Sequence, residues 1–173
     1  TKKLLFFVFI GFLSTSFAYT VDDQGEDPIN QKDGDGLKQG KWVFFGKDRP
    51  QAGFPEDGKI EEGPYKDDRK EGVWVKYHND GVTPKLKGEY HNNRPNGAYT
   101  KINADGSIRE EGTFNRNKYS GDLVRFHPNG QREYEATFND NGNEEGPVKF
   151  FYSNGQVEFE YTANGGTPTG PAT

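Results

Sequence analysis

The chain has 173 residues, a formal net charge of −5, only 30% hydrophobic residues and a mean hydropathy of −1.04. This length suits one domain of ordinary size, but the low apolar content argues against a thick two-layer core. The absence of cysteine excludes disulfides, thiolate metal sites and cysteine nucleophiles. Aromatic residues are nevertheless plentiful, with 14 Phe, 9 Tyr and 2 Trp, whereas disordered chains are usually poor in them. Together with 23 glycines, this composition predicts a thin β-structure of short strands and tight turns.

The amino-terminal residues 1–18 have the pattern of a secretory signal peptide. Lys2 and Lys3 precede an apolar run that ends at Leu13, and Ser16-Phe17-Ala18 provides small residues for cleavage after Ala18. The apolar run is too short to span a bilayer, which takes about 20 residues. We therefore expect the protein to be exported to the periplasm or the extracellular space.

Residues 19–36 are predicted to be an acidic flexible linker, because six acidic residues face one lysine and little apolar surface is available for burial. Asp33-Gly34-Asp35-Gly36 and the similar run of residues 139–142 could suggest calcium ligands. Neither completes an EF-hand loop, and Asp, Asn and Gly are the residues that tight turns prefer. Turns are the favoured interpretation of both stretches.

A glycine-led repeat organises residues 37–173. The leading glycines are separated by 25, 24, 25 and 24 residues, which is the signature of a repeat architecture, and they are Gly72, Gly97, Gly121, Gly146 and Gly170. With Gly40 as an earlier copy, the predicted units are 37–71, 72–96, 97–120, 121–145 and 146–169, and a sixth begins at Gly170. The 32-residue step from Gly40 to Gly72 predicts an inserted loop around residues 46–54.

Each unit contains two runs that flank an Asn-Gly or Asp-Gly pair. The pairs begin at Asp57, Asp80, Asp105, Asn129 and Asn154. Such pairs favour type I′ hairpin turns, so each repeat is predicted to be one β-hairpin. A two-residue turn in the last unit would pair Tyr152 with Val157, Phe150 with Phe159 and Val148 with Tyr161. A bulge or three-residue turn is expected in the first two units, and polar stretches such as 92–96 and 115–118 are expected to make the return turns.

Two columns of side chains follow from this pattern, because side chains alternate between the faces of a strand. The column two residues after each leading glycine is expected to be buried, and it contains Trp42, Trp74, Tyr99, Leu123 and Val148. The column five residues after each glycine lies on the opposite face, and it contains Phe45, Tyr77, Ile102, Phe126 and Phe151. In the last two units Lys149 and the glutamates Glu133, Glu135, Glu158 and Glu160 are expected to share that opposite face.

The openings such as Gly72-Val73-Trp74-Val75-Lys76-Tyr77, the Asn-Gly turns and the closes Gly88-Glu89-Tyr90 and Gly112-Thr113-Phe114 carry a resemblance. Together they resemble the MORN-repeat variant of YwqK-family antitoxin proteins, over residues 37–173. The resemblance implies an all-β fold, an elongated single-layer antiparallel sheet of stacked β-hairpin repeats. It also implies use as a scaffold or binding surface.

We predict an exported, non-enzymatic protein-binding or scaffold module, with Tyr77, Ile102, Phe126 and Phe151 as candidate partner-binding residues. The alternative is that neighbouring side chains simply cover this column. The family label adds a second functional hypothesis, an antitoxin or immunity protein that neutralises a partner toxin.

The residues give little support to an enzyme. His78 and His127 occupy equivalent places in two repeats, which favours a repeat-pattern role over a unique catalytic base, and no catalytic, metal or cofactor residues are predicted. The net charge of −5, less +2 for residues 1–18 and −5 for residues 19–36, leaves −2 on the repeats. This near-neutral charge argues against a nucleic-acid partner and leaves contact with a membrane surface open.

Overall fold

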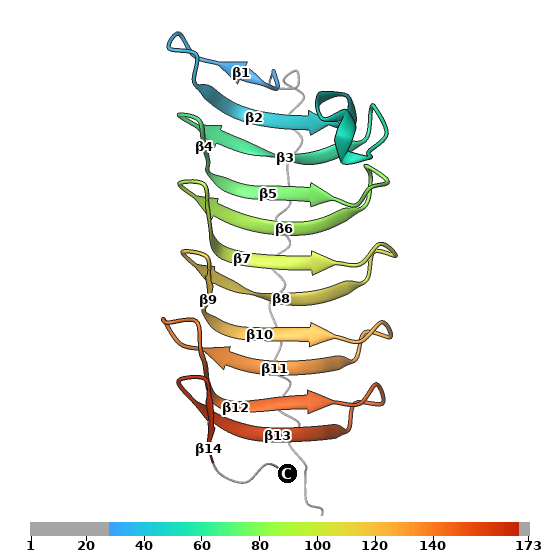
Figure 1. The fold of residues 1–173 in the computed structure, drawn as a ribbon, viewed down its shortest axis with the longest axis vertical. Coiled ribbons are helices and arrows are strands. Elements are labelled where there is room, and N and C mark those ends of the chain that lie inside the picture. Colours follow the sequence, from blue (N-terminus) through green and yellow to red (C-terminus); the bar gives the residue numbers. More distant parts are fainter. Residues whose placement is uncertain (1–27, 170–173) are drawn as a thin grey trace, which may run out of the picture.

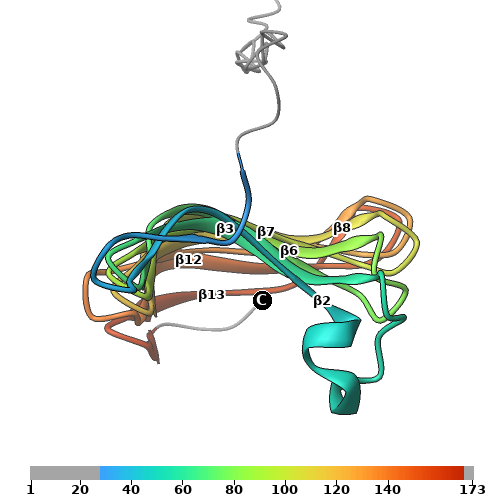
Figure 2. The same ribbon diagram turned by 90° about the horizontal axis from the view of Figure 1, so that it is seen from above.

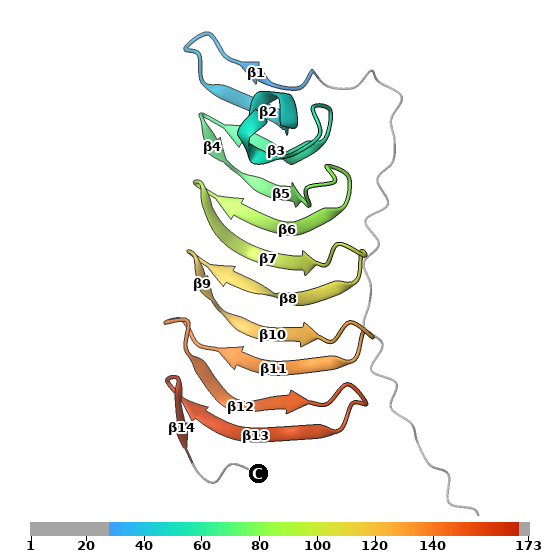
Figure 3. The same ribbon diagram turned by 45° about the vertical axis from the view of Figure 1, so that its right-hand side comes forward.

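The computed structural model describes residues 28–169, which form one open antiparallel sheet of 14 strands (Figure 1). The main path through the sheet follows the order of the chain, and two short strands pair beside it, β4 with β3 and β9 with β8. The strands are β1 (Gln31–Lys32), β2 (Lys38–Phe45), β3 (Lys59–Lys66), β4 (Arg69–Lys70), β5 (Gly72–Tyr77), β6 (Pro84–His91), β7 (Arg94–Ile102), β8 (Ile108–Asn115), β9 (Lys118–Tyr119), β10 (Gly121–Phe126), β11 (Arg132–Phe138), β12 (Glu144–Phe151), β13 (Val157–Asn164) and β14 (Thr167–Thr169). The predicted stacking of hairpins in a single layer is confirmed (Figures 1 and 3).

The hairpin turns differ from the predicted type I′ geometry. Between β10 and β11 the Gly130 N–H donates to the His127 carbonyl (N···O 2.9 Å), and the His127 N–H donates to the Gln131 carbonyl (2.8 Å). Only Gly130 of the Asn129-Gly130 pair is left-handed, with φ 82°. This is a type I turn closed by a left-handed glycine, because a type I′ turn would need positive φ at both residues. Asn129 has another role, since its Oδ1 accepts a hydrogen bond from the Gln131 N–H (3.1 Å).

Every hairpin shows the same register shift one residue before its turn, so the bulge expected in the first two units is confirmed and recurs in the other three. In the last hairpin Val148 pairs with Tyr161 and Phe150 with Phe159, as predicted, but Phe151 pairs with Val157. The longer turn leaves one extra, unpaired residue on the second strand, and the predicted pairing resumes after that residue. Val157 therefore lies on the face of Phe151, and Tyr152 belongs to the turn.

Type I′ geometry occurs instead in the return turns, which lie at the other end of the strands from the hairpin turns (Figure 1). The predicted return turns at 92–96 and 115–118 are confirmed, and consecutive left-handed residues occupy them: Asn92 and Asn93 (φ 51° and 66°), and Arg116 and Asn117 (φ 49° and 74°). Asp67 and Asp68 form the equivalent pair before β4, with φ 51° and 60°. Asparagine and aspartate tolerate this conformation better than most residues, which explains the polar composition of these turns.

The leading glycines within the described residues have left-handed backbone, with φ 66° at Gly40 and Gly121, 74° at Gly72, 79° at Gly146 and 121° at Gly97. A Cβ added at Gly121 would meet no atom within 4 Å, so this glycine is needed for its conformation rather than for close packing. The left-handed residue re-aims the chain between each return turn and the strand that follows.

The predicted buried column is confirmed, and Trp74, Leu123 and Val148 are its most completely buried members, with 1%, 1% and 0% exposure. The larger members of the column pair with smaller cross-strand partners, and the smaller members pair with larger ones. The pairs along the sheet are Trp42–Gly63, Trp74–Gly88, Tyr99–Gly112, Leu123–Ala136 and Val148–Tyr161. Large residues therefore face glycine in the first three units, and smaller ones face larger partners in the last two.

Replacing Gly63 with alanine is expected to lower the free energy of unfolding by about 1.5 kcal/mol, because overpacking a core typically costs 1–3 kcal/mol. A Cβ at this position would lie 2.5 Å from Cδ2 of the Trp74 ring, which rests on Gly63 from the next hairpin. Urea unfolding followed by tryptophan fluorescence measures the change. The control is Gly34→Ala, where a Cβ meets nothing within 4 Å. Equal stability of Gly63→Ala and the parent protein would contradict this packing.

At the amino-terminal edge of the sheet, the structure differs from the predicted linker. Residues 31–32 form β1, which pairs with β2, so the carboxyl-terminal end of the region 19–36 belongs to the sheet. The predicted turn at Asp33 is confirmed, because its Oδ1 accepts hydrogen bonds from the N–H groups of Asp35 (3.0 Å) and Leu37 (2.9 Å). The predicted signal peptide and residues 19–27 lie outside the described residues.

The predicted insertion in the first unit is confirmed, although it is not a plain loop. It forms two 3-10 turns, η1 (Gly46–Asp48) and η2 (Pro50–Ala52), which project from one side of the sheet (Figure 2). Arg49, between them, reaches back so that its Nη2 lies 3.3 Å from Oε1 of Glu61. The insertion is therefore attached to the sheet.

Candidate binding surfaces

The four predicted partner-binding residues, Tyr77, Ile102, Phe126 and Phe151, end the first strand of successive hairpins and are all half-buried. Their cross-strand partners are Pro84, Ile108, Arg132 and Val157, in the same order. Paired residues of an antiparallel sheet share a face, so the apolar partners extend the column. We call the combined set the apolar row: Tyr77, Pro84, Ile102, Ile108, Phe126, Phe151 and Val157.

Ile108 and Val157 are the most exposed of the row's new members, with 42% and 47% exposure. Sequence reasoning missed them because a two-residue turn places them on the wrong face. A usable signal was present, since each follows its turn glycine by two residues. The structure thus brings the four predicted residues into one line and adds three apolar neighbours to it.

The two equivalent histidines connect neighbouring repeats beneath the row. His78 Nε2 lies 2.9 Å from the carbonyl oxygen of Ile102, and His127 Nε2 lies 2.7 Å from that of Phe151. A carbonyl can only accept, so in each case this nitrogen carries the proton. Both histidines therefore make the same inter-repeat hydrogen bond, and their predicted repeat-pattern role is confirmed.

Charged side chains flank the apolar row. The Tyr77 hydroxyl donates to Glu62, and burial together with this hydrogen bond raises the pKa of Tyr77 above its usual value. Farther along, Arg132 Nη1 lies 2.7 Å from Glu135 Oε2, and Lys149 Nζ lies 3.7 Å from Glu160 Oε2. The row is therefore an apolar strip bordered by ion pairs.

Glu133 and Glu158, predicted on the row's face, do not take part in the regular pairing there. Each is the extra residue at the register shift of its hairpin, opposite Phe126 and Phe151 respectively. Both side chains are exposed. Their assignment to the row's face stays a prediction, because an unpaired residue at a bulge has no cross-strand partner that fixes its face.

The face of the buried column contains two buried glutamates that sequence reasoning did not anticipate. Glu110 accepts hydrogen bonds from Lys101 Nζ (2.6 Å), Arg125 Nε (2.9 Å) and the Tyr99 hydroxyl (2.7 Å). Burial raises the pKa of Glu110, but the hydrogen bonds from these three residues lower it by more. The net pKa lies below the ordinary value, so the carboxylate stays charged at neutral pH. A fully paired carboxylate that is charged at neutral pH has no proton to supply there, which fits a structural role.

Glu61 repeats this arrangement two strands from the amino-terminal edge. Its Oε2 lies 2.6 Å from Lys70 Nζ, and its Oε1 lies 3.3 Å from Arg49 Nη2. Lys70 also lies over the Trp74 ring, 3.8 Å from the centroid. The face of the buried column is thus held together partly by buried charge pairs.

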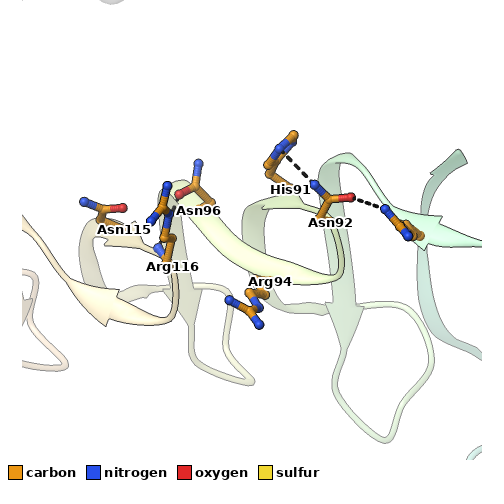
Figure 4. Close-up of a pocket in the computed structure, with 7 residues that line it drawn as sticks. His91, Asn92, Arg94, Asn96, Asn115 and Arg116 are labelled. Carbon is orange, nitrogen blue, oxygen red and sulfur yellow. Dashed lines mark hydrogen bonds between the residues drawn. The ribbon is translucent and has the colours of Figure 1, made fainter.

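A polar groove of about 530 Å³ opens along the return turns (Figure 4). We call it the return-turn groove, and it is lined by arginine, asparagine and histidine side chains: Arg69, His91, Asn92, Arg94, Asn96, Asn115 and Arg116. Arg69 Nη1 donates to Asn92 Oδ1 (3.0 Å), and the amide nitrogen of Asn92 lies 3.1 Å from His91 Nε2. Sequence reasoning treated these residues as turn-formers, because their clustering depends on how repeats stack.

No group of three or more His, Cys, Asp or Glu side chains within residues 28–169 is placed to hold a metal ion. Among the same residues, no helix is both long and apolar enough to cross a membrane.

The sequence of the last two full units matches a known repeat. The family described as "MORN repeat variant" matches residues 119–140 and 144–164, which contain the hairpins β10–β11 and β12–β13. No curated protein sequence matches the chain.

Two solved structures share a weak likeness. One is Staphylococcus aureus TarM in complex with fondaparinux, alpha-GlcNAc-glycerol and UDP, with 15% identity and a TM-score of 0.36, over 53% of this chain and 18% of that chain. The other is a GtfA/B complex bound to UDP and GlcNAc, with 8% identity and a TM-score of 0.31, over 54% and 23%. The chain thus spans less than a quarter of either, and scores this low support no argument. The sequence match is more specific: residues 119–140 and 144–164 match the MORN repeat variant.

Proposed function

We propose that the protein is a non-enzymatic binding or scaffold module whose apolar row contacts a protein partner. MORN repeats are generally protein- or membrane-binding modules. The observation that supports a protein partner is the row itself, an apolar strip that continues over four repeats with ion pairs beside it. An apolar centre with a polar border is the usual composition of a protein interface.

The shape of the sheet suits this function. Successive hairpins present equivalent side chains at regular intervals, so an extended partner can contact several repeats at once. The buried carboxylates are fully paired and the histidines are engaged in inter-repeat hydrogen bonds, so neither group is poised for acid–base chemistry. These observations favour binding over catalysis.

Export of the protein is part of the proposal and rests on residues 1–18. A periplasmic or extracellular location would restrict the partner to exported or envelope proteins. Neutralisation of an exported toxin, as an immunity protein would perform it, is one form of this function. That form predicts a toxin gene beside the gene for this chain and tight binding of its product.

The double variant Phe126→Ser/Phe151→Ser tests the row. It is expected to remain folded, at a cost of about 1–2 kcal/mol for each half-buried ring, and to lose the partner recovered by the parent protein. The measurement is cross-linking and pull-down from an envelope extract, with circular dichroism to verify folding.

The matched control is Phe159→Ser, which removes a ring of 40% exposure from the opposite face. It should recover the partner as well as the parent protein does. Unfolding of the double variant would show that the row is structural, and equal recovery of the partner would show that the row is not the binding surface.

A further inference from the structure

The return-turn groove lies at the end of the strands opposite the hairpin turns, away from the apolar row (Figures 1 and 4). We propose that this groove binds an acidic segment of a polypeptide, with its arginines on the carboxylates and its asparagines on the peptide backbone. The inference is independent of the apolar row and concerns a second surface of the same molecule.

The charge of the groove favours an acidic ligand. Among the described residues, Arg69, Arg94 and Arg116 form no salt bridge, whereas Arg49, Arg125 and Arg132 each pair with a glutamate. The groove therefore concentrates guanidinium groups without carboxylate partners in a chain of net charge −5. Guanidinium groups bind carboxylates through paired, charge-assisted hydrogen bonds, so an acidic ligand would supply what the chain itself does not.

The acidic side chain next to the groove is already engaged. Glu71 accepts hydrogen bonds from His91 Nδ1 (2.6 Å) and from the Asn92 N–H (3.1 Å), one through each carboxylate oxygen. It therefore fixes His91 and the turn at the rim of the groove. It does not pair with any of the three arginines.

The side-chain amides of the groove suit a peptide backbone. Asn96 Oδ1 accepts a hydrogen bond from the Arg116 N–H (3.3 Å), and the exposed Asn115 lies beside it in the groove. Side-chain amides offer both donors and acceptors. A peptide backbone needs both, whereas the oxygens of a phosphate group can use donors alone. The lining thus favours a peptide over a simple phosphate-bearing ligand.

The spacing of the arginines also suits an extended peptide. Arg69 and Arg94 follow equivalent return turns of successive repeats, two strands apart, which corresponds to about 10 Å. A peptide in the polyproline II conformation rises about 3.1 Å per residue, so side chains three residues apart are separated by about 9 Å on one side. Two acidic residues three positions apart would match Arg69 and Arg94.

The surroundings of the groove argue against broad anionic surfaces. The preceding return turn contains Asp67 and Asp68, both exposed. A membrane or a nucleic acid would extend over these carboxylates and be repelled, whereas a short peptide would end within the groove.

The test is fluorescence anisotropy of a labelled nine-residue peptide with aspartate at every third position and alanine between. In low salt the peptide is expected to bind, and the same peptide with asparagine in place of aspartate should bind about tenfold more weakly or worse. Arg94→Gln and Arg116→Gln should each weaken binding by about tenfold, because each removes a charge-assisted contact. Both arginines are exposed, so these changes leave the fold intact.

The matched control is Arg109→Gln, an exposed arginine at the other end of β8, which should bind the peptide like the parent protein. Equal weakening by Arg109→Gln would show that the attraction is non-specific. Stronger binding of inorganic phosphate, or of phosphatidylserine vesicles, through Arg94 and Arg116 would overturn the peptide assignment. The Phe126→Ser/Phe151→Ser variant should keep its affinity for the peptide, so failure of one proposal is distinguishable from failure of the other.

Discussion

Replacing Trp74 with alanine is expected to lower the free energy of unfolding by about 4 kcal/mol, within the range for a buried Trp. The side chain is 1% exposed and lies edge-on to the rings of Tyr65 and Tyr90, with centroids 5.0 and 6.5 Å away. Its Nε1 donates to the Pro64 carbonyl (2.9 Å). Gly63 lies beneath the ring, and it has no side chain with which to fill the cavity.

Guanidinium chloride unfolding followed by circular dichroism at several wavelengths measures this loss. Trp42 remains as a fluorescent probe of the first hairpin. The matched control is Val73→Ala, which truncates the neighbouring side chain of 54% exposure and should change stability by less than about 0.5 kcal/mol. Similar losses for the two variants would mean that the column is not the core of the sheet.

Glu110→Gln is expected to cost about 2–3 kcal/mol, because it leaves the cations of a buried cluster without their shared anion. The glutamate side chain is 7% exposed, and Lys101 and Arg125 approach its two oxygens separately. Glutamine keeps the shape but removes the charge, so the loss reports electrostatics rather than packing. Glu111→Gln, on an exposed neighbour, is the control and should be near neutral.

The same carboxylate predicts how stability depends on pH. The pKa of Glu110 is lowered in the folded state, so the unfolded chain binds a proton more readily. Its contribution is fully present above the ordinary value of 4.5 and is lost as the pH falls through the folded-state pKa below it. Urea unfolding between pH 7 and pH 3 should therefore show a shallower acid loss for Glu110→Gln than for the parent protein. Parallel curves would contradict a charged cluster.

The repeat and its buried column could be predicted from the sequence because both depend on spacing alone. The turn type could not, since an Asn-Gly pair is compatible with type I′ geometry and with a type I turn closed by a left-handed glycine. The two turns shift the pairing by one residue, and this shift decides whether Val157 lies on the face of Phe150 or on the face of Phe151. The four residues of the predicted site precede the turn, so the error left their positions unaffected.

The groove and the buried charge clusters were beyond the reach of the sequence for a different reason. Arg94 and Arg116 come from separate return turns, and Arg125 reaches Glu110 from the next hairpin. Which side chains meet across repeats depends on the register between hairpins, which no spacing within one repeat determines.

The order of strands in the sheet has a consequence for how the molecule folds and opens. Each strand along the main path pairs with its predecessor and successor, so no contact has to wait for distant parts of the chain to meet. Local contacts of this kind lower the entropy lost in closing loops and favour rapid folding. They also let an outer hairpin detach while the middle of the array stays ordered, so cooperativity weakens as the array lengthens.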